Sequence, residues 1–343
     1  MLSFVLQSGC SLTMLHDKVP KKQIRKAGDN LAAGLLSGDE RLKALELVGH
    51  WRAAHIEPLH QTLLEIERIC GNDASTILVS RLKRIDTIVN KLGRESIKKY
   101  IHLDTLHDVA GCRLIVDNED EVLRYADLLS RTDMFHQPVD HMTSPKASGY
   151  RGFHIICRHD APEYGYKQLN VEVQIRSRVQ HDWATAVETY DQIRETSLKF
   201  DQGPNLERRY FWLASAIMNN DVEDMSSATE ELRALDADLH VLEELSAASD
   251  SMFVTYEGEI DRSSSCLLTV DLGVQQVDIE VFSPEDEISA ADKYTELETG
   301  KEEPGIIYLL ARAGSLKDLR FAYPNYSSDI SQFVGWLTKT ING

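Results

Sequence analysis

Apolar and polar residues alternate strictly from Asn170 to Arg176. A period of two is typical of a half-buried strand, in which successive side chains face opposite sides of the sheet. The apolar residues would face a core, and Glu172, Gln174 and Arg176 would share the other face. Taken alone, such a polar face is more typical of an ordinary solvated strand, so the other motifs decide whether it is a site.

Residues 81–92 follow a helical period instead. Apolar residues recur at i, i+3, i+4 and i+7, namely at Ile85, Ile88, Val89 and Leu92. This stripe predicts an amphipathic helix over 81–92. Lys83, Thr87 and Lys91 are four residues apart and would share its other side. Two ammonium groups beside a hydroxyl suit a polyphosphate, although a basic, solvent-facing helix has the same pattern.

The same periodicities place further elements along the chain. Helices are expected over residues 39–70, 119–134, 178–198, 205–250, 287–299 and 328–338. Strands are expected over residues 112–116, 153–158, 170–176, 266–272, 277–282 and 305–311, with a loop over 137–149. Together they predict an α/β (α+β) protein, with a mixed β-sheet flanked by helices, a helical segment and a small C-terminal α/β module.

The composition changes after Gly203, which predicts a division of the chain. The expected parts are an N-terminal extension (1–38), a main domain (39–203), a helical segment (204–255) and a small C-terminal module (256–343). No catalytic constellation is apparent in the last part.

Net charge narrows the classes of partner. The chain has 343 residues and a formal net charge of −18. Contacts with a phosphate backbone or an anionic membrane need cations. We therefore expect no DNA and no membrane partner, and the charge also argues against tRNA. A small, locally basic pocket for a nucleotide is compatible with this balance.

The five cysteines are scattered, and none has CxxC spacing. This pattern argues against a disulfide framework or a structural zinc site and fits a reducing cytosol. The N-terminus lacks the basic region and the apolar length of a secretion signal, and no segment approaches a membrane span. The expected location is cytoplasmic.

Two carboxylates are candidates for a metal site. Asp108 and Glu172 each lie at the edge of a predicted strand and could share Mg²⁺, which prefers carboxylate oxygens together with substrate phosphates. The groups that could neutralise and hold a triphosphate are Arg81, Lys83, Thr87, Lys91 and Arg113. Tyr150 offers a ring for stacking a base. These are the parts that phosphoryl transfer needs, whereas the GxxxxGK(S/T) and GxGxxG loops of common nucleotide-binding folds are absent.

Four stretches in order resemble the four consecutive motifs of the RelA/SpoT synthetase domain. They are Arg81-x-Lys83-x-x-x-Thr87-x-x-x-Lys91, Asp108-Val-Ala-Gly-Cys-Arg113, Ser148-Gly-Tyr150-Arg-Gly-Phe-His154 and Glu172-Val-Gln174-Ile-Arg176, with His181-Asp-Trp183-Ala after the last. The resemblance covers about residues 40–200. It implies a nucleotidyltransferase-like mixed sheet and a GTP pyrophosphokinase. Such an enzyme moves the β,γ-pyrophosphate of ATP onto the 3′-hydroxyl of GDP or GTP, releasing AMP and making the alarmone (p)ppGpp.

The resemblance also implies a role for each matched residue. Arg81 and Arg113 would sandwich the adenine, and Lys83, Thr87 and Lys91 would hold the phosphates of ATP. Asp108 and Glu172 would bind Mg²⁺, and Glu172 would also take the proton of the acceptor hydroxyl. Tyr150 would stack on the acceptor base. The residues around its sugar and phosphates would be Lys146, His154, Gln174 and His181.

The chain departs from the family pattern at several positions. Thr87 stands where the family usually has Ser, which keeps the hydroxyl. After Trp183 the usual Glu-His pair is replaced by the turn around Glu188, which leaves the choice of acceptor less certain. His107-Asp108 resembles a hydrolase pair, but Asp108 belongs to the synthetase motif and no matching histidines precede it. Hydrolysis is therefore not expected.

Two alternatives to (p)ppGpp synthesis stay open. A toxin-like branch of the family uses adenosine nucleotides or the 3′ end of tRNA as the acceptor. A catalytically silent nucleotide-binding regulator could have the same fold, although the intact Asp108 and Glu172 argue against it. The sequence also leaves open the oligomeric state, a homo-oligomer included, any allosteric ligand and the role of residues 205–343.

Overall fold

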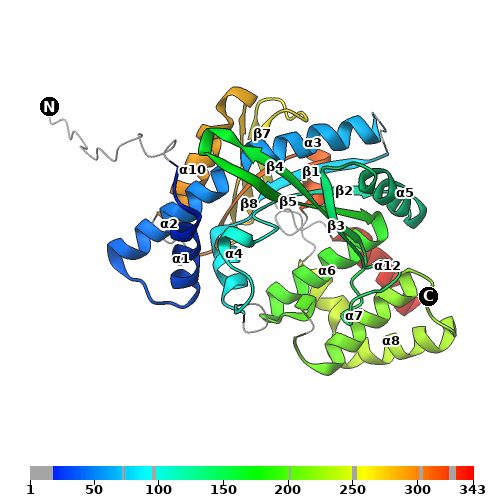
Figure 1. The fold of residues 1–343 in the computed structure, drawn as a ribbon. Coiled ribbons are helices and arrows are strands. Elements are labelled where there is room, and N and C mark those ends of the chain that lie inside the picture. Colours follow the sequence, from blue (N-terminus) through cyan, green and yellow to red (C-terminus); the bar gives the residue numbers. More distant parts are fainter. Residues whose placement is uncertain are drawn as a thin grey trace.

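The computed structural model describes residues 18–71, 73, 75–94, 98–200, 202–248, 253–300, 304–323 and 330–343. It contains a nine-stranded mixed sheet flanked by helices (Figure 1), which confirms the predicted fold class. The helices are α1 (Lys21–Ala32), α2 (Gly38–Ala53), α3 (Ile56–Cys70), α4 (Ile85–Leu92), α5 (Glu119–Ser130), α6 (Arg178–Arg194), α7 (Asn205–Met218), α8 (Met225–Leu239), α9 (Val241–Ala248), α10 (Glu287–Thr299), α11 (Leu316–Ala322) and α12 (Ser331–Asn342). The strands are β1 (Ile77–Leu82), β2 (Ala110–Val116), β3 (Phe135–Asp140), β4 (Phe153–Ala161), β5 (Tyr166–Ser177), β6 (Phe253–Glu257), β7 (Ser265–Asp271), β8 (Gln276–Phe282) and β9 (Ile306–Arg312). Within these described ranges, no helix has the length and apolar character needed to cross a membrane.

The strand order across the sheet is β3-β4-β5-β2-β1-β9-β7-β8-β6. β2 runs parallel to β5, with Gly111 opposite Glu172 and Arg113 opposite Gln174. β1 is antiparallel to β2 on one side and to β9 on the other. The strands of the predicted C-terminal module therefore continue the same sheet. The boundaries between the predicted parts stay predictions.

The helix predicted over 81–92 is wrong at its start. Arg81 and Leu82 belong to β1, and α4 begins only at Ile85. The cause is the aliphatic run from Ile77 to Val79, which starts a strand, and the pairing of Ser80 and Arg81 with strands on both edges, which continues it. Lys83 lies in the strand-to-helix connection, where its N–H donates to the carbonyl of Val109 at 2.9 Å.

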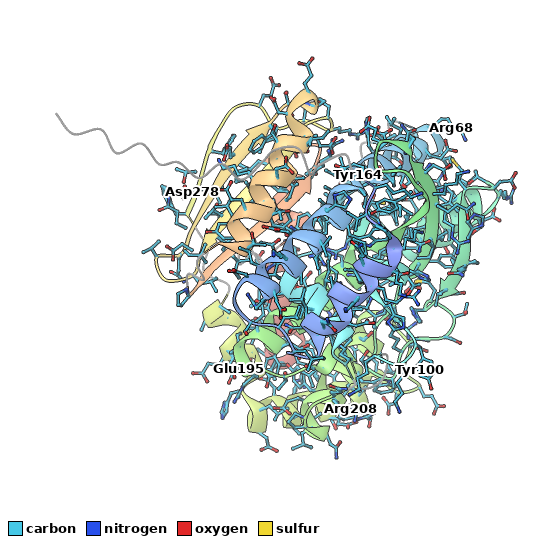
Figure 2. The ribbon with its side chains drawn as sticks, turned by 60° about the vertical axis from the view of Figure 1, so that its left-hand side comes forward. Arg68, Tyr100, Tyr164, Glu195, Arg208 and Asp278 are labelled. Atoms are coloured by element: carbon cyan, nitrogen blue, oxygen red, sulfur yellow. The ribbon has the colours of Figure 1, made fainter. Side chains whose placement is uncertain are left out.

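Other differences concern where elements begin and end. The predicted loop over 137–149 begins too early, because residues 137–140 complete the edge strand β3. The helix predicted to residue 198 ends at Arg194, since Glu195 (labelled in Figure 2) takes a left-handed φ of 53° and stops α6. The long helical stretches 39–70 and 205–250 are divided into two and three helices respectively. Residues 1–17 of the predicted extension, the last two residues of the stretch predicted over 205–250 and the first two residues of the helix predicted over 328–338 lie outside the described ranges.

Alternation along the strands separates a core face of the sheet from a polar face. Val171, Val173 and Ile175 of β5 are fully buried in the largest hydrophobic core cluster, as predicted. Glu172 and Gln174 alternate with them and so face the opposite side. Helices α3 and α5 pack on the core side of β5, whereas α6 contacts β2 and β5, and α11 contacts β1. The polar face is therefore covered by elements from two distant parts of the chain.

Candidate active site

A cavity of about 210 Å³ lies on the polar face, where β1, β2 and β5 meet α4. The predicted site residues that line it are Arg81, Lys83, Thr87, Lys91, Asp108, Arg113, Lys146, His154, Glu172 and Gln174. Both candidate metal ligands are among them. The structure thus brings together all the predicted site residues except Tyr150 and His181.

Local geometry explains why distant motifs meet in this cavity. The parallel register of β2 and β5 sets Gly111 opposite Glu172, and Asp108 comes just before β2. On the next strand, the chain turns directly from β1 into α4, so that Lys83 precedes the helix and Thr87 and Lys91 follow within it. Thr87 and Lys91 are one helical turn apart and both face the cavity.

Asp108 binds the two lysines that give this part of the site its positive charge. Its Oδ2 accepts hydrogen bonds from the ammonium groups of Lys83 and Lys91, each at 2.8 Å. Burial opposes ionisation of Asp108, but the two lysines outweigh it and hold the pKa of this carboxyl below its usual range. Burial lowers the pKa of Lys83, although Asp108 opposes that effect. The contacts between the carboxylate and the two lysines thus offset part of the cost of burying these groups.

Glu172 is held by its neighbours on β4 and β5. Oε1 lies 3.2 Å from Nδ1 of His154, and Oε2 accepts from Nε2 of Gln174 at 2.7 Å. Burial opposes ionisation, but these partners outweigh it, so the pKa of Glu172 lies well below its usual range. Arg176 supports both partners of Glu172. It donates to Oε1 of Gln174 at 2.9 Å, and it donates at 3.1 Å to the hydroxyl of Tyr150, which contacts His154.

Tyr150 does not line the cavity. It is only 4% exposed and lies behind His154, with its hydroxyl 2.5 Å from Nε2 of that ring. The Arg176 guanidinium and the Lys146 ammonium each lie 4.9 Å from its ring centroid. Burial raises the pKa of the Tyr150 phenol. The ring is thus placed to orient His154, and the predicted stacking on a base has no support in this arrangement.

His181 is also separated from the cavity. It is 1% exposed, and its Nε2 donates to the carbonyl of Phe321 at 2.8 Å. Burial pushes the pKa of His181 well below its ordinary value, so the imidazole is neutral. Its predicted contact with the acceptor likewise lacks support here, because the C-terminal end of α11 occupies the space beside it.

Several cavity residues were missed by the sequence analysis, and Tyr323 is the most informative. Its ring centroid lies 5.8 Å from the guanidinium carbon of Arg81 and 5.9 Å from that of Arg113. Arg113 also donates to the carbonyl of Ala322 at 2.8 Å. Burial lowers the pKa of Arg113 to about 10. An aromatic ring from the C-terminal part of the chain therefore lies against the two arginines predicted to hold an adenine.

Two further cations that the sequence analysis missed, Lys199 and Arg94, also line the cavity. Lys199 forms an ion pair with Glu188, and the Arg94 guanidinium lies 3.5 Å from the ring centroid of Phe200. No motif in the sequence pointed to Lys199, Phe200 or Arg94. Lys199 and Phe200 join the cavity through tertiary packing, whereas Arg94 follows the end of α4. Glu188 belongs to the turn that stands in place of the family's usual pair, and it forms an ion pair with Lys199.

The two carboxylates fit a hard cation that also binds phosphate. Oδ1 of Asp108 is buried and has no hydrogen-bond partner among the described residues, which suits a cation ligand. Among those residues no group of three or more His, Cys, Asp or Glu side chains could enclose a metal. Mg²⁺ is usually held by one or two carboxylates, waters and substrate phosphates, so Asp108 and Glu172 match its needs.

Comparison with curated proteins gives relatives for part of the chain. The GTP pyrophosphokinase YjbM of Bacillus subtilis is 30% identical over 130 residues, which cover 36% of this chain and 59% of the relative. A probable chloroplastic GTP diphosphokinase, RSH2, of Arabidopsis thaliana is 29% identical over 107 residues, 31% of this chain and 14% of the relative. The uncharacterized protein Rv1366 of Mycobacterium tuberculosis is 32% identical over 146 residues, 40% of this chain and 49% of the relative. The chain thus spans less than two thirds of the length of these relatives.

Solved structures give weaker similarity. The small alarmone synthetase 1 of Bacillus subtilis bound to its product pppGpp is 23% identical with a TM-score of 0.42, over 52% of this chain and 94% of that chain. A GTP pyrophosphokinase family protein of Streptococcus pneumoniae has 25% identity and a TM-score of 0.40, over 53% and 93%. The family model described as "Region found in RelA / SpoT proteins" matches residues 80–192. These residues hold all four motifs, and the chain therefore carries a RelA/SpoT domain.

Proposed function

We propose that this protein transfers the β,γ-pyrophosphate of ATP to the 3′-hydroxyl of GDP or GTP, making (p)ppGpp and releasing AMP. The observation that carries the proposal is that Asp108 and Glu172 line one cavity together with Lys83, Lys91 and Arg81. The acceptor oxygen would attack the β-phosphorus of ATP, and the bond from that phosphorus to the bridging oxygen of AMP would break. The hydroxyl proton would pass to Glu172.

The phosphate side of the cavity supplies positive charge without new residues having to arrive. Lys83 and Lys91 are ion-paired with Asp108 and would exchange that carboxylate for phosphate oxygens, beside the hydroxyl of Thr87. Asp108 and Glu172 would hold Mg²⁺, which when bound neutralises charge on the phosphoryl oxygens. Lys146, His154 and Gln174 would face the acceptor nucleotide.

Glu172 would act mainly by position. Its pKa lies well below its usual range, so it is fully ionised at neutral pH but is a weaker base than a group poised near pH 7. Phosphoryl transfer relies mostly on alignment and charge neutralisation, which makes a weak but well-oriented base sufficient. His154 and Gln174 each hold one of its two oxygens.

The test is transfer of label from γ-labelled ATP in the presence of Mg²⁺, with GDP, GTP, ATP or deacylated tRNA as separate acceptors. We expect labelled product with GDP or GTP. Glu172→Gln is expected to lower the rate by about a hundredfold or more, because it removes the base and a metal ligand. It also weakens the contacts of Glu172 with His154 and Gln174, so thermal unfolding is measured to confirm that the variant is folded at the assay temperature. Glu280→Gln is the control, since Glu280 is a strand carboxylate on β8 that pairs with Lys293 outside the cavity.

Each other result has a defined meaning. Label on ATP or on tRNA would favour the toxin-like branch. If the wild type and the Glu172→Gln variant are equally inert toward all acceptors, the silent regulator is left. The net charge of −18 argues against tRNA among these acceptors.

A further inference from the structure

A buried arginine joins α2 to α10 directly behind the phosphate side of the cavity. Arg52 of α2 is 1% exposed and forms an ion pair with Glu298 of α10. It also donates to Oγ1 of Thr295 at 3.0 Å and to the backbone carbonyl of Lys83 at 3.1 Å. α10 is the orange helix that lies beside α2 in both views (Figures 1 and 2).

Glu298 reaches the same segment independently of Arg52. Its Oε1 accepts a hydrogen bond from the backbone N–H of Ile85, the first residue of α4, at 3.1 Å. The first N–H groups of a helix have no partner within the helix, and a carboxylate there also complements the helix dipole. Glu298 therefore caps α4 from 213 positions away in the sequence.

These contacts fix the backbone that carries the predicted phosphate-binding groups. The Lys83 N–H is bound to Val109, its carbonyl to Arg52, and the Ile85 N–H to Glu298. The side chains of Lys83 and Lys91 then converge on one oxygen of Asp108. A displacement of this segment by about 1 Å would misplace both ammonium groups together.

We propose that Glu298 is a positioning residue for the phosphate-binding lysines Lys83 and Lys91. It acts through Arg52 and through the backbone of Lys83 and Ile85, and so makes the ATP side of the cavity depend on α10. The identity of the ligand rests on the proposed function; the positioning itself rests on the contacts above.

The chain offers a matched control at the other end of the same helix. Glu287 of α10 forms an ion pair with Arg312 of β9, and these side chains are 17% and 8% exposed. Burial raises the pKa of Glu287 and of Glu298 alike. Glu287 pairs with β9 rather than with the segment 83–92 that carries the lysines. Loss of this pair would therefore cost stability without touching that segment.

The experiment compares Glu298→Gln with Glu287→Gln in the full chain. Glutamine keeps the size and one amide oxygen but removes the charge that pairs with arginine. For Glu298→Gln we expect amide hydrogen exchange of peptides within residues 83–92 to quicken about tenfold, and the KM for ATP to rise by a similar factor. For Glu287→Gln we expect a comparable fall in Tm with unchanged exchange in that segment and an unchanged KM.

Thr295→Val keeps the test decisive if Glu298→Gln does not fold, because it removes one hydrogen bond of Arg52 and leaves both charges. A smaller change in the same exchange readout is expected. The proposal would be overturned if Glu298→Gln and Glu287→Gln changed amide exchange in residues 83–92 equally, or if neither variant changed it. A wild-type chain that transfers no pyrophosphate would contradict the proposed function but not the positioning role of Glu298. The exchange measurement would still decide whether Glu298 positions residues 83–92.

Discussion

Asp108 shows how a single side chain can prepare a site for anions. One oxygen accepts from two lysines, and the other is buried with no hydrogen-bond partner among the described residues. Burial alone would favour the neutral acid, but the lysines outweigh it and the carboxylate stays charged. An entering polyphosphate therefore meets cations that are already in place and must only replace one oxygen.

His55 makes a prediction about pH and stability at the same scale. It is 1% exposed, its Nδ1 donates to the carbonyl of Trp51 at 2.7 Å, and burial lowers its pKa to about 4. The folded value lies below the unfolded value of about 6.5, so the folded state excludes the proton. The free energy of unfolding therefore contains the full contribution of neutral His55 above pH 6.5. It falls by about 3 kcal/mol in all as the pH is lowered toward 4.

Urea unfolding between pH 7.5 and pH 4.5 checks this expectation. His55→Phe should be less stable than the wild type at pH 7.5, because the bond to Trp51 is lost. It should also lose less stability on acidification. Parallel pH curves for the two proteins would show that His55 does not carry the effect.

At the scale of elements, only features with a local period could be predicted. The alternation in β5 and the four-residue spacing of Thr87 and Lys91 are readable because each depends on neighbours in sequence. The strand character of Arg81 was missed because β1 gains its second partner from β9. Tyr323 and Glu298 could not be predicted at all, since they reach the site across more than 200 residues.

Tyr323 leads to a prediction about the end of α11. Its ring lies against Arg81 and Arg113, where the family resemblance puts the adenine. Ring and adenine would compete for the same guanidinium groups, so Tyr323→Ala should lower the KM for ATP severalfold. Tyr308→Ala is a control on β9 that is not among the residues lining the cavity. A higher KM in Tyr323→Ala would instead make the ring part of the base-binding surface.

Two helical glycines test the fit between α2 and α10. A Cβ at Gly49 would lie 2.3 Å from Cγ2 of Thr295, whereas one at Gly335 in α12 would meet nothing within 4 Å. Gly49→Ala should lower the free energy of unfolding by about 1–3 kcal/mol despite the better helix former. Gly335→Ala should raise it by about 0.5–1 kcal/mol. Equal effects in urea unfolding would mean that α2 and α10 are less closely packed than described.

At the scale of the whole molecule, the two ends of the chain share one core. Leu267, Tyr294 and Leu310 belong to the same buried cluster as Trp51 and Leu82. The change in composition after Gly203 gave no sign of this shared core, because regular alternation within a strand does not indicate which other strand it pairs with. The two parts of the sheet are connected by the pairing of β1 with β9, which are far apart in the sequence.

This central position of β1 has a consequence during synthesis on the ribosome. β2 can pair with one edge of β1 early, but the other edge waits until β9, which begins at Ile306, has been translated. An open strand edge recruits foreign strands, so a nascent chain that stalls before β9 is prone to aggregate. A chain stopped after residue 252 should collect in the insoluble fraction, while the full chain stays in solution. If the shortened chain is monomeric and soluble, something other than β9 shields that edge. If it aggregates, translation must nearly finish before the strand that carries Arg81 is paired on both edges.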